Sequence, residues 1–248
     1  MTAFHTDVPA HDIDVVLARP TETSITVSID VANESEATVE YWTEKAPRKQ
    51  QSAPVKIPAD RVGAIALTGL QPGTEYAYRV GLAKPGTREI AWGAESRFRT
   101  RVAAGTPFSF VIQADSHLDA NMDPATYTQT LKNMRAERAD FLVDLGDTFM
   151  TDKRGQDYER ALPQYDAQRY YFGLACDAMP LFMVLGNHDG EKGDVGRGIA
   201  EWSYSQRVAR FPAPEIDGRI YTGSTGMKDG RGTNYYAFEW GDALFVVL

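Results

Sequence analysis

The spacing of apolar residues changes near Pro107, and this change limits the folds that the chain can adopt. Between about residues 11 and 101, apolar and polar residues alternate in short segments, of which Ile25 to Val31 is one. Alternation with a period of two is typical of half-buried antiparallel strands. Turn-forming residues such as those from Gly69 to Gly73 separate the segments, and no convincing long helix is present in this half. We therefore predict an all-β sandwich over residues 11–101, after an N-terminal tail at 1–10.

Beyond Pro107, apolar strand-like runs are separated by helix-length stretches, which is typical of an α/β layer fold. The expected strands are 108–114, 141–145, 181–185 and a pair within 235–248. The expected helices are one that follows the capping pair Asp123-Pro124, one across 157–176 with Pro163 as an interruption, and one within 198–211. We predict a linker at 102–107 and an α/β domain at 108–248.

The composition excludes several classes of protein. The 34 acidic and 26 basic residues give a net charge of −8, which disfavours nonspecific binding to nucleic acid or to an anionic membrane surface. No apolar run is long enough to span a bilayer, and the first ten residues do not resemble a signal peptide. The single cysteine, Cys176, excludes an internal disulfide framework and a Cys-rich zinc site, and we expect it to be a small core residue.

Three of the predicted strands are followed by polar residues that can bind metal. The segments are Asp115-Ser116-His117, Gly146-Asp147 and Gly186-Asn187-His188-Asp189. In open α/β sheets, ligand sites gather at the carboxyl ends of strands, and Asp, His and Asn suit zinc, manganese or iron. A single motif of this kind would more often be a turn, but three in succession with helix-length spacers favour a metal centre.

These segments match the first three motifs, D-x-H, G-D and G-N-H-D, of the calcineurin-like metallophosphoesterases. The resemblance implies that Asp115 and His117 bind one metal ion, that Asp147 bridges two, and that Asn187 binds the second. The ions would be zinc, manganese or iron, either divalent or mixed-valence. The reaction it implies is hydrolysis of a phosphomonoester or phosphodiester by a metal-bound hydroxide. His188 would lie outside the metal ligands and would stabilise the transition state or protonate the leaving group.

Other polar residues near these motifs are weaker candidates. Asp144 and Asp189 could orient the metal ligands, or could equally be solvated loop carboxylates. Lys192 and Arg197 lie in a Gly-rich stretch and could reach a substrate phosphate, although an ordinary loop is the simpler interpretation.

The first domain resembles a fibronectin type III domain in the segment from Leu67 to Val80, where Tyr76 matches the corner tyrosine. A sandwich ahead of a phosphoesterase domain resembles the purple acid phosphatases, a similarity that also favours an exported or periplasmic protein. Met150 stands where those enzymes have a metal-binding tyrosine, and His117 replaces their D-x-G glycine. We therefore expect no purple charge-transfer colour.

The family's last two motifs contribute three more metal-binding histidines, but the sequence contains only His5, His11, His117 and His188. The apolar run from Ala243 to Leu248 also has the character of a buried central strand. We therefore expect a further C-terminal portion that completes the α/β domain and supplies histidine ligands.

Two other functions stay open at this point. The chain could be a non-catalytic binding protein, or an inactive fragment, whose sandwich recognises a polymer or protein through exposed aromatic residues such as Trp42 or Trp92. A metal-stabilised structural domain ranks last, because structural zinc sites favour Cys and His over bridging carboxylates.

Overall fold

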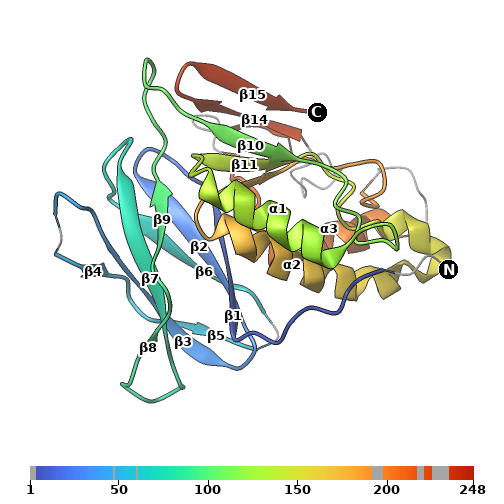
Figure 1. The fold of residues 1–248 in the computed structure, drawn as a ribbon, viewed down its shortest axis with the longest axis horizontal. Coiled ribbons are helices and arrows are strands. Elements are labelled where there is room, and N and C mark those ends of the chain that lie inside the picture. Colours follow the sequence, from blue (N-terminus) through green and yellow to red (C-terminus); the bar gives the residue numbers. More distant parts are fainter. Residues whose placement is uncertain (1–3, 47, 60, 192–197, 217–220, 225–234) are drawn as a thin grey trace.

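The computed structural model describes residues 4–46, 48–59, 61–191, 198–216, 221–224 and 235–248. An antiparallel β-sandwich formed by the first part of the chain packs beside an α/β domain formed by the second (Figure 1). The fold class predicted from the spacing of apolar residues is therefore confirmed.

Two antiparallel sheets form the sandwich. One has the order β1-β2-β6, with β1 at Ile13–Ala18, β2 at Ser24–Val31 and β6 at Gly63–Thr68. The other contains β4 (Gln50–Gln51), β3 (Ser35–Trp42), β7 (Glu75–Ala83) and β8 (Ala91–Trp92), while β5 (Val55–Ile57) pairs with β3 and β9 (Ser96–Arg99) with β7. Alternate side chains of the strands fill the space between the sheets. The Tyr76 hydroxyl accepts a hydrogen bond of 2.9 Å from the Gln71 backbone N–H, as expected for a tyrosine corner.

Three layers make up the α/β domain (Figure 1). The central parallel sheet has the order β10-β11-β12, with strands at Phe110–Gln113, Phe141–Asp144 and Leu181–Met183. Helices α1 (Pro124–Ala136) and α2 (Leu162–Cys176) cover one of its faces, and the chain also forms the 3-10 helix η1 (Thr151–Ala161) and helix α3 (Ile199–Arg210). An antiparallel sheet of β13 (Tyr221–Ser224), β14 (Tyr235–Trp240) and β15 (Ala243–Val247) lies on the other face.

Local sequence signals explain where two of the helices begin. The Asp123 carboxylate accepts hydrogen bonds from the backbone N–H groups of Ala125 and Thr126, so it caps α1 as expected. The interruption expected at Pro163 falls slightly earlier, where η1 ends at Ala161 and α2 begins at Leu162, and Pro163 itself lies in the first turn of α2. Backbone N–H groups in the first turn have no intrahelical partner, so a proline costs nothing there.

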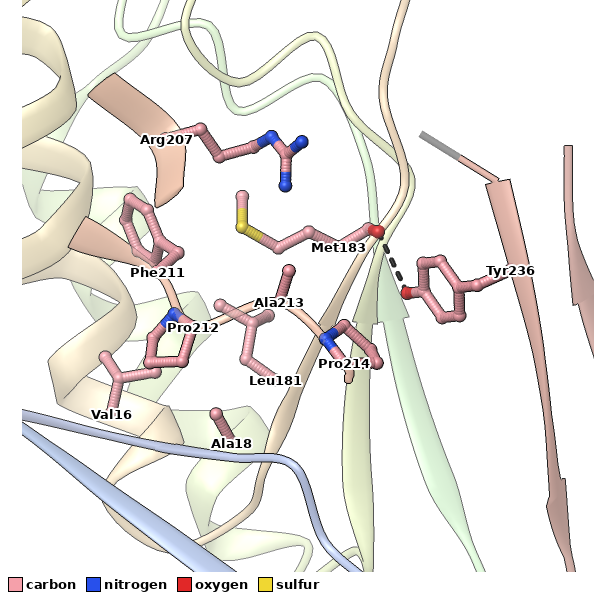
Figure 2. Close-up of a pocket in the computed structure, with 10 residues that line it drawn as sticks. All are labelled: Val16, Ala18, Leu181, Met183, Arg207, Phe211, Pro212, Ala213, Pro214 and Tyr236. Carbon is pink, nitrogen blue, oxygen red and sulfur yellow. Dashed lines mark hydrogen bonds between the residues drawn. The ribbon is translucent and has the colours of Figure 1, made fainter. Parts of the chain in front are cut away.

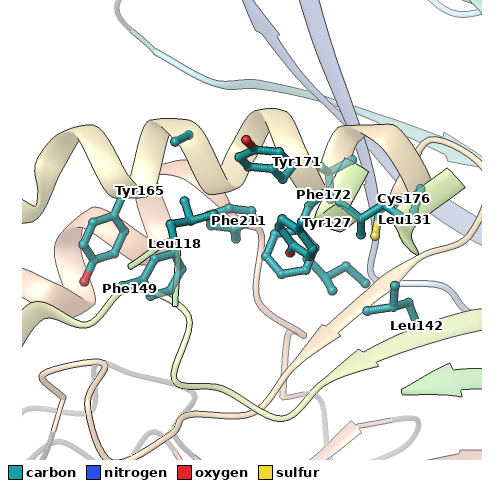
Figure 3. Close-up of a cluster of buried hydrophobic side chains, with 14 of the residues drawn as sticks. Leu118, Tyr127, Leu131, Leu142, Phe149, Tyr165, Tyr171, Phe172, Cys176 and Phe211 are labelled. Atoms are coloured by element: carbon teal, nitrogen blue, oxygen red, sulfur yellow. The ribbon is translucent and has the colours of Figure 1, made fainter. Parts of the chain in front are cut away.

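A large apolar cluster under α2 anchors the loops that follow β10 and β11 (Figure 3). Leu118 and Phe149 are both fully buried in this cluster, and the Phe149 ring stacks on Tyr165 at a centroid distance of 4.0 Å. Cys176 lies in the same cluster and is buried, as expected for a small core residue. Because the loops carry the predicted metal ligands, their anchoring in a close-packed core restricts where those ligands can lie.

The two parts of the chain are joined by buried polar contacts. The fully buried Arg169 of α2 donates to the backbone carbonyls of Ser28 and Arg210, each at 2.8 Å. Burial lowers the pKa of its guanidinium to about 10. The Tyr78 hydroxyl donates to the carbonyl of Asp177 at 2.6 Å, and the Asp177 carboxylate is paired with Arg135 at 2.8 Å. The sandwich is therefore fixed against the helical layer by directional contacts as well as by apolar packing.

A narrow apolar crevice lies where β1, β12 and the segment after α3 meet (Figure 2). Beside it, the Tyr236 hydroxyl donates to the Met183 carbonyl at 2.9 Å. The crevice has a volume of about 10 Å³, which is room for about one water molecule, so it is a packing gap and not a ligand site.

Candidate metal centre

The chain leaves β10 through a loop with unusual backbone geometry. Asp115, His117 and Leu118 have positive φ values of 57°, 41° and 54°, in the left-handed region that residues other than glycine seldom occupy. Such conformations cost about 1 kcal/mol or more each and persist only where the surroundings impose them. The buried Leu118 side chain and backbone bonds to the next loop impose them here. The loop therefore presents Asp115 and His117 in a fixed arrangement.

Backbone hydrogen bonds join this loop to the loop that follows β11. The Asp115 N–H donates to the Gly146 carbonyl at 3.0 Å, and the His117 N–H donates to the Asp147 carbonyl at 3.3 Å. Gly146 itself has a φ of 92° and lies so close to the backbone of Gly186 that a Cβ atom on either glycine would collide with the other loop. Glycine is therefore required at both positions for the loops to approach each other.

Three of the predicted ligands meet at this point. One ligand atom each from Asp115, His117 and Asp147 lies within 4.8 Å of the others. The His117 Nε2 atom is 3.4 Å from Asp115 Oδ1 and 4.0 Å from Asp147 Oδ2, and it is buried without a hydrogen-bond partner among the described residues. A buried ring nitrogen directed at two carboxylates fits a metal ion, which would satisfy the nitrogen and the oxygens together. Asp115 is exposed, so the centre is open to solvent.

The third loop places His188 beside the triad. The His188 N–H donates to Asp147 Oδ1 at 2.8 Å, and Asn187, the preceding residue, is exposed. The His188 Nδ1 atom lies 2.9 Å from the carboxylate of Asp152 in η1. Asp152 was not among the residues predicted from sequence, because it follows no predicted strand. Its contact fixes the orientation of the imidazole ring and leaves Nε2 available to a substrate.

Asp189 connects the loop that follows β11 to the loop that follows β12. Its Oδ2 atom accepts hydrogen bonds from the N–H groups of Asp147 at 3.0 Å and Gly186 at 2.8 Å, and Oδ1 accepts from those of Thr148 and Phe149, both at 2.8 Å. Asp189 is buried, so the alternative of a solvated loop carboxylate is wrong for this residue. Burial raises the pKa of its carboxyl to about 6, although the backbone N–H bonds act in the opposite direction.

Asp144 is likewise buried and hydrogen-bonded. Its carboxylate accepts bonds from the Gln113 side-chain amide at 3.0 Å and from the Thr148 hydroxyl at 2.6 Å. Burial raises the pKa of this carboxyl to about 7. The solvated alternative is therefore wrong for Asp144 too, and the residue supports the loop that carries Asp147.

Two buried glutamines of α2 hold the first two loops from the helical side. Gln164 Nε2 donates to the backbone carbonyls of His117 at 2.6 Å and Thr148 at 3.1 Å. Gln168 Nε2 donates to the Ser116 hydroxyl at 2.8 Å and to the same Thr148 carbonyl at 2.9 Å. Neither glutamine was predicted, because a glutamine on a helix gives no signal of this role in the sequence.

The N-terminal segment also contacts the first loop. Phe4 forms a β-bridge with Asp119, and the His5 N–H donates to the Leu118 carbonyl at 2.6 Å. The Phe4 ring lies against the guanidinium of Arg154 in η1, 4.2 Å from the ring centroid. Residues far from the loop in sequence therefore cover its outer side.

The remaining predicted residues divide into three groups. Lys192 and Arg197 lie outside the described residues. Met150 is buried. Trp42 and Trp92 are half-buried, and a cation lies over each ring, Lys49 at 4.4 Å and Arg79 at 4.6 Å.

Comparison with known proteins agrees with this geometry. Residues 10–100 match the family described as purple acid phosphatase, N-terminal domain, and residues 108–243 match the calcineurin-like phosphoesterase family. Because the second match covers more than half of the chain, the protein belongs to the calcineurin-like phosphoesterases. No curated protein matches the sequence.

Two solved structures share the whole arrangement of sandwich and α/β domain. The purple acid phosphatase PPD1 from yellow lupin (Lupinus luteus) has a TM-score of 0.65 at 17% identity, over 95% of this chain and 44% of that one. PhoD has a TM-score of 0.58 at 16% identity, over 94% of this chain and 50% of that one. The chain thus spans half or less of the length of these structures, and the likeness shows the fold.

Among the helices that the structure describes, none combines the length and the apolar character needed to cross a bilayer.

Proposed function

We propose that the chain carries the metal-binding part of a phosphoester hydrolase that acts on phosphomonoesters or phosphodiesters at a two-metal site. The observation that carries the proposal is the convergence of Asp115, His117 and Asp147, with the His117 Nε2 atom buried and unpartnered beside two carboxylates. Membership of the calcineurin-like phosphoesterases supports the hydrolase class. Export from the cytoplasm rests on the resemblance to purple acid phosphatases alone.

The role proposed for each residue is the one that the resemblance to the calcineurin-like family implies. Asp115 and His117 would hold one ion, Asp147 would bridge two, and Asn187 would hold the second, with zinc, manganese or iron as suitable ions. Bound ions of this kind supply a nucleophile from water at neutral pH and stabilise negative charge on the phosphoryl oxygens. His188, oriented by Asp152 through Nδ1, would donate a proton from Nε2 to the leaving oxygen.

Additional ligands would come from polypeptide that covers one apolar edge of the α/β domain. Strands β10 and β15 are both at the edges of their sheets, and four apolar side chains along them are exposed: Phe110, Ile112, Leu244 and Val246. Exposed apolar residues on unpaired edge strands favour the addition of further strands. We propose that the C-terminal portion expected from the sequence binds here and contributes the histidines of the family's last two motifs.

Replacement of Asp147 by Asn tests the metal site. In the full-length protein supplied with Mn²⁺, the Asp147→Asn variant should bind the ion at least about 10- to 100-fold more weakly, because that loss is typical when only a group that orients a ligand is changed. It should also lose hydrolysis of p-nitrophenyl phosphate and bis(p-nitrophenyl) phosphate. The exposed Asp12→Asn variant, measured by calorimetry and initial rates in parallel, serves as the control and should match the parent protein. Unchanged Mn²⁺ affinity and turnover in Asp147→Asn would exclude the proposed centre.

The alternative of a polymer-binding sandwich lacks a supporting observation. Large apolar side chains that are exposed lie outside the sandwich in the described part of the chain. The two candidate tryptophans are half-buried beneath Lys49 and Arg79, so they do not form an open aromatic surface.

A further inference from the structure

A second polar pocket lies between the N-terminal segment and η1, apart from the metal triad. Its volume is about 380 Å³, within the usual range of ligand sites. Three basic side chains, Lys153, Arg154 and Arg160, contribute to its lining together with Phe4 and a single carboxylate, Asp157. In Figure 1, the described part of the blue N-terminal segment approaches the yellow helix η1, which carries the basic residues. The protein has a net charge of −8, but the lining of this pocket has more positive than negative charges.

The Arg154 guanidinium is held in a defined position. It lies over the Phe4 ring, and its Nη2 atom donates to Gln164 Oε1 at 3.1 Å. Its Nε atom is buried and lacks a hydrogen-bond partner within the described ranges. Burial and the charge of nearby Arg160 both lower the pKa of Arg154. The guanidinium is therefore ordered, and a guanidinium is suited to an oxyanion.

The other lining charges do not neutralise this group. Lys153 is exposed and makes no ion pair with a residue that the structure describes. Asp157 lies 3.8 Å from Arg160, so the lining carboxylate is directed to Arg160 and not to the other two cations. Lys153 and Arg154 therefore remain as a pair of positive charges on one wall of the pocket.

The pocket adjoins the metal centre through two short connections. Gln164 accepts a hydrogen bond from Arg154 and donates one to the His117 carbonyl. Lys153 directly follows Asp152, whose carboxylate is bonded to His188. An anion bound to Lys153 and Arg154 would thus be linked through Gln164 and Asp152 to the residues His117 and His188 of the metal centre.

We propose that this pocket binds a phosphate-type dianion, with Lys153 and Arg154 as its charged ligands. The choice of phosphate among oxyanions rests on the proposed function, since a phosphoesterase meets phosphate as product and as substrate. Two sources share this chemistry: inorganic phosphate released by hydrolysis, and a second phosphate group on the substrate.

Calorimetric titration of the chelator-treated, metal-free protein with inorganic phosphate tests the site. The parent protein should bind phosphate, and the Lys153→Glu variant should bind it at least about tenfold more weakly, because a charge-assisted bond is replaced by repulsion. Lys132→Glu, an exposed α1 variant with the same change of charge, should bind as the parent does. Equal affinity in the parent and Lys153→Glu, or an equal loss in Lys132→Glu, would overturn the proposal. Circular dichroism would check that each variant is folded.

Titration of the Mn²⁺-loaded protein distinguishes the two sources. If the pocket holds a second substrate phosphate, hydroquinone bisphosphate should bind about tenfold or more tightly than phenyl phosphate, and Lys153→Glu should remove the difference. If the pocket holds free phosphate, the two esters should bind alike while Lys153→Glu still weakens phosphate binding to the metal-free protein. Because the metal-free titration involves no hydrolysis, failure of the proposed enzymatic function would leave its result intact.

Discussion

The clamp formed by Asp189 should be essential to both stability and metal binding. Each carboxylate oxygen of Asp189 accepts hydrogen bonds from two backbone N–H groups. In Asp189→Asn, an amide nitrogen replaces one of these oxygens and cannot accept hydrogen bonds from the two N–H groups that face it, whichever way the amide is oriented. Leaving a buried N–H group without an acceptor costs about 1–3 kcal/mol, so two should lower the free energy of unfolding by about 2–6 kcal/mol. Urea unfolding of the metal-free protein measures this loss. Because the clamp joins the loops of Asp147 and Asn187, Mn²⁺ affinity should also fall by about tenfold or more.

A matched surface variant provides the control for this prediction. Asp166 is an exposed carboxylate on α2 paired with Arg210 at 2.6 Å, and Asp166→Asn should change the free energy of unfolding by less than about 1 kcal/mol. If Asp189→Asn were no less stable than Asp166→Asn and bound Mn²⁺ as the parent protein does, the four hydrogen bonds would not be holding the loops together.

Two further predictions concern buried charged groups. The pKa of Asp144, about 7, lies above the ordinary value of 3.8, so the folded metal-free protein binds more protons than the unfolded chain between these pH values. Its stability should therefore fall by up to about 4 kcal/mol as the pH rises from 4 to 8, and Asp144→Asn should be less sensitive to pH and more stable than the parent at pH 8. Urea unfolding across this pH range checks the prediction, and parallel pH profiles for the two proteins would contradict it. Arg169→Met should lower the free energy of unfolding by about 2–4 kcal/mol, because the carbonyls of Ser28 and Arg210 lose a buried charged donor. Thermal unfolding measures this loss of stability. If Arg169→Met lost less stability than the exposed Lys132→Met variant, the hydrogen bonds of Arg169 would not be stabilising.

Much of the fold could be predicted from the periodicity of apolar residues. Period-two alternation indicated the sandwich, and the runs at 141–145 and 181–185 became β11 and β12 with small shifts at their ends. The helix after Asp123 was also predictable, because a capping carboxylate followed by proline has a local physical cause. The interruption near Pro163 was predictable but its exact position was not, because the sequence does not show that the proline lies just after the point where η1 ends and α2 begins.

The metal centre could be predicted only where its residues follow strands. Asp115, His117 and Asp147 belong to short motifs at strand ends, and the structure brings them together. Asp152 and Gln164 act through contacts between elements that are separate in the sequence, so no local pattern could reveal them. For the same reason, the sequence could not show whether Asp144 and Asp189 are buried or lie in solvated loops, because their burial depends on how the loops pack.

The contact between the first residues and the loop of His117 has a practical consequence for protein production. Phe4 and His5 lie against Asp119 and Leu118, so a peptide fused to the N-terminus would be tethered within a few residues of the loop that carries His117. A polyhistidine affinity tag in that place would bring many imidazoles to a site built to bind metal through imidazole and carboxylate groups. It would compete for the added ions and distort measured stoichiometry, so metal analysis calls for a removable tag or one attached elsewhere.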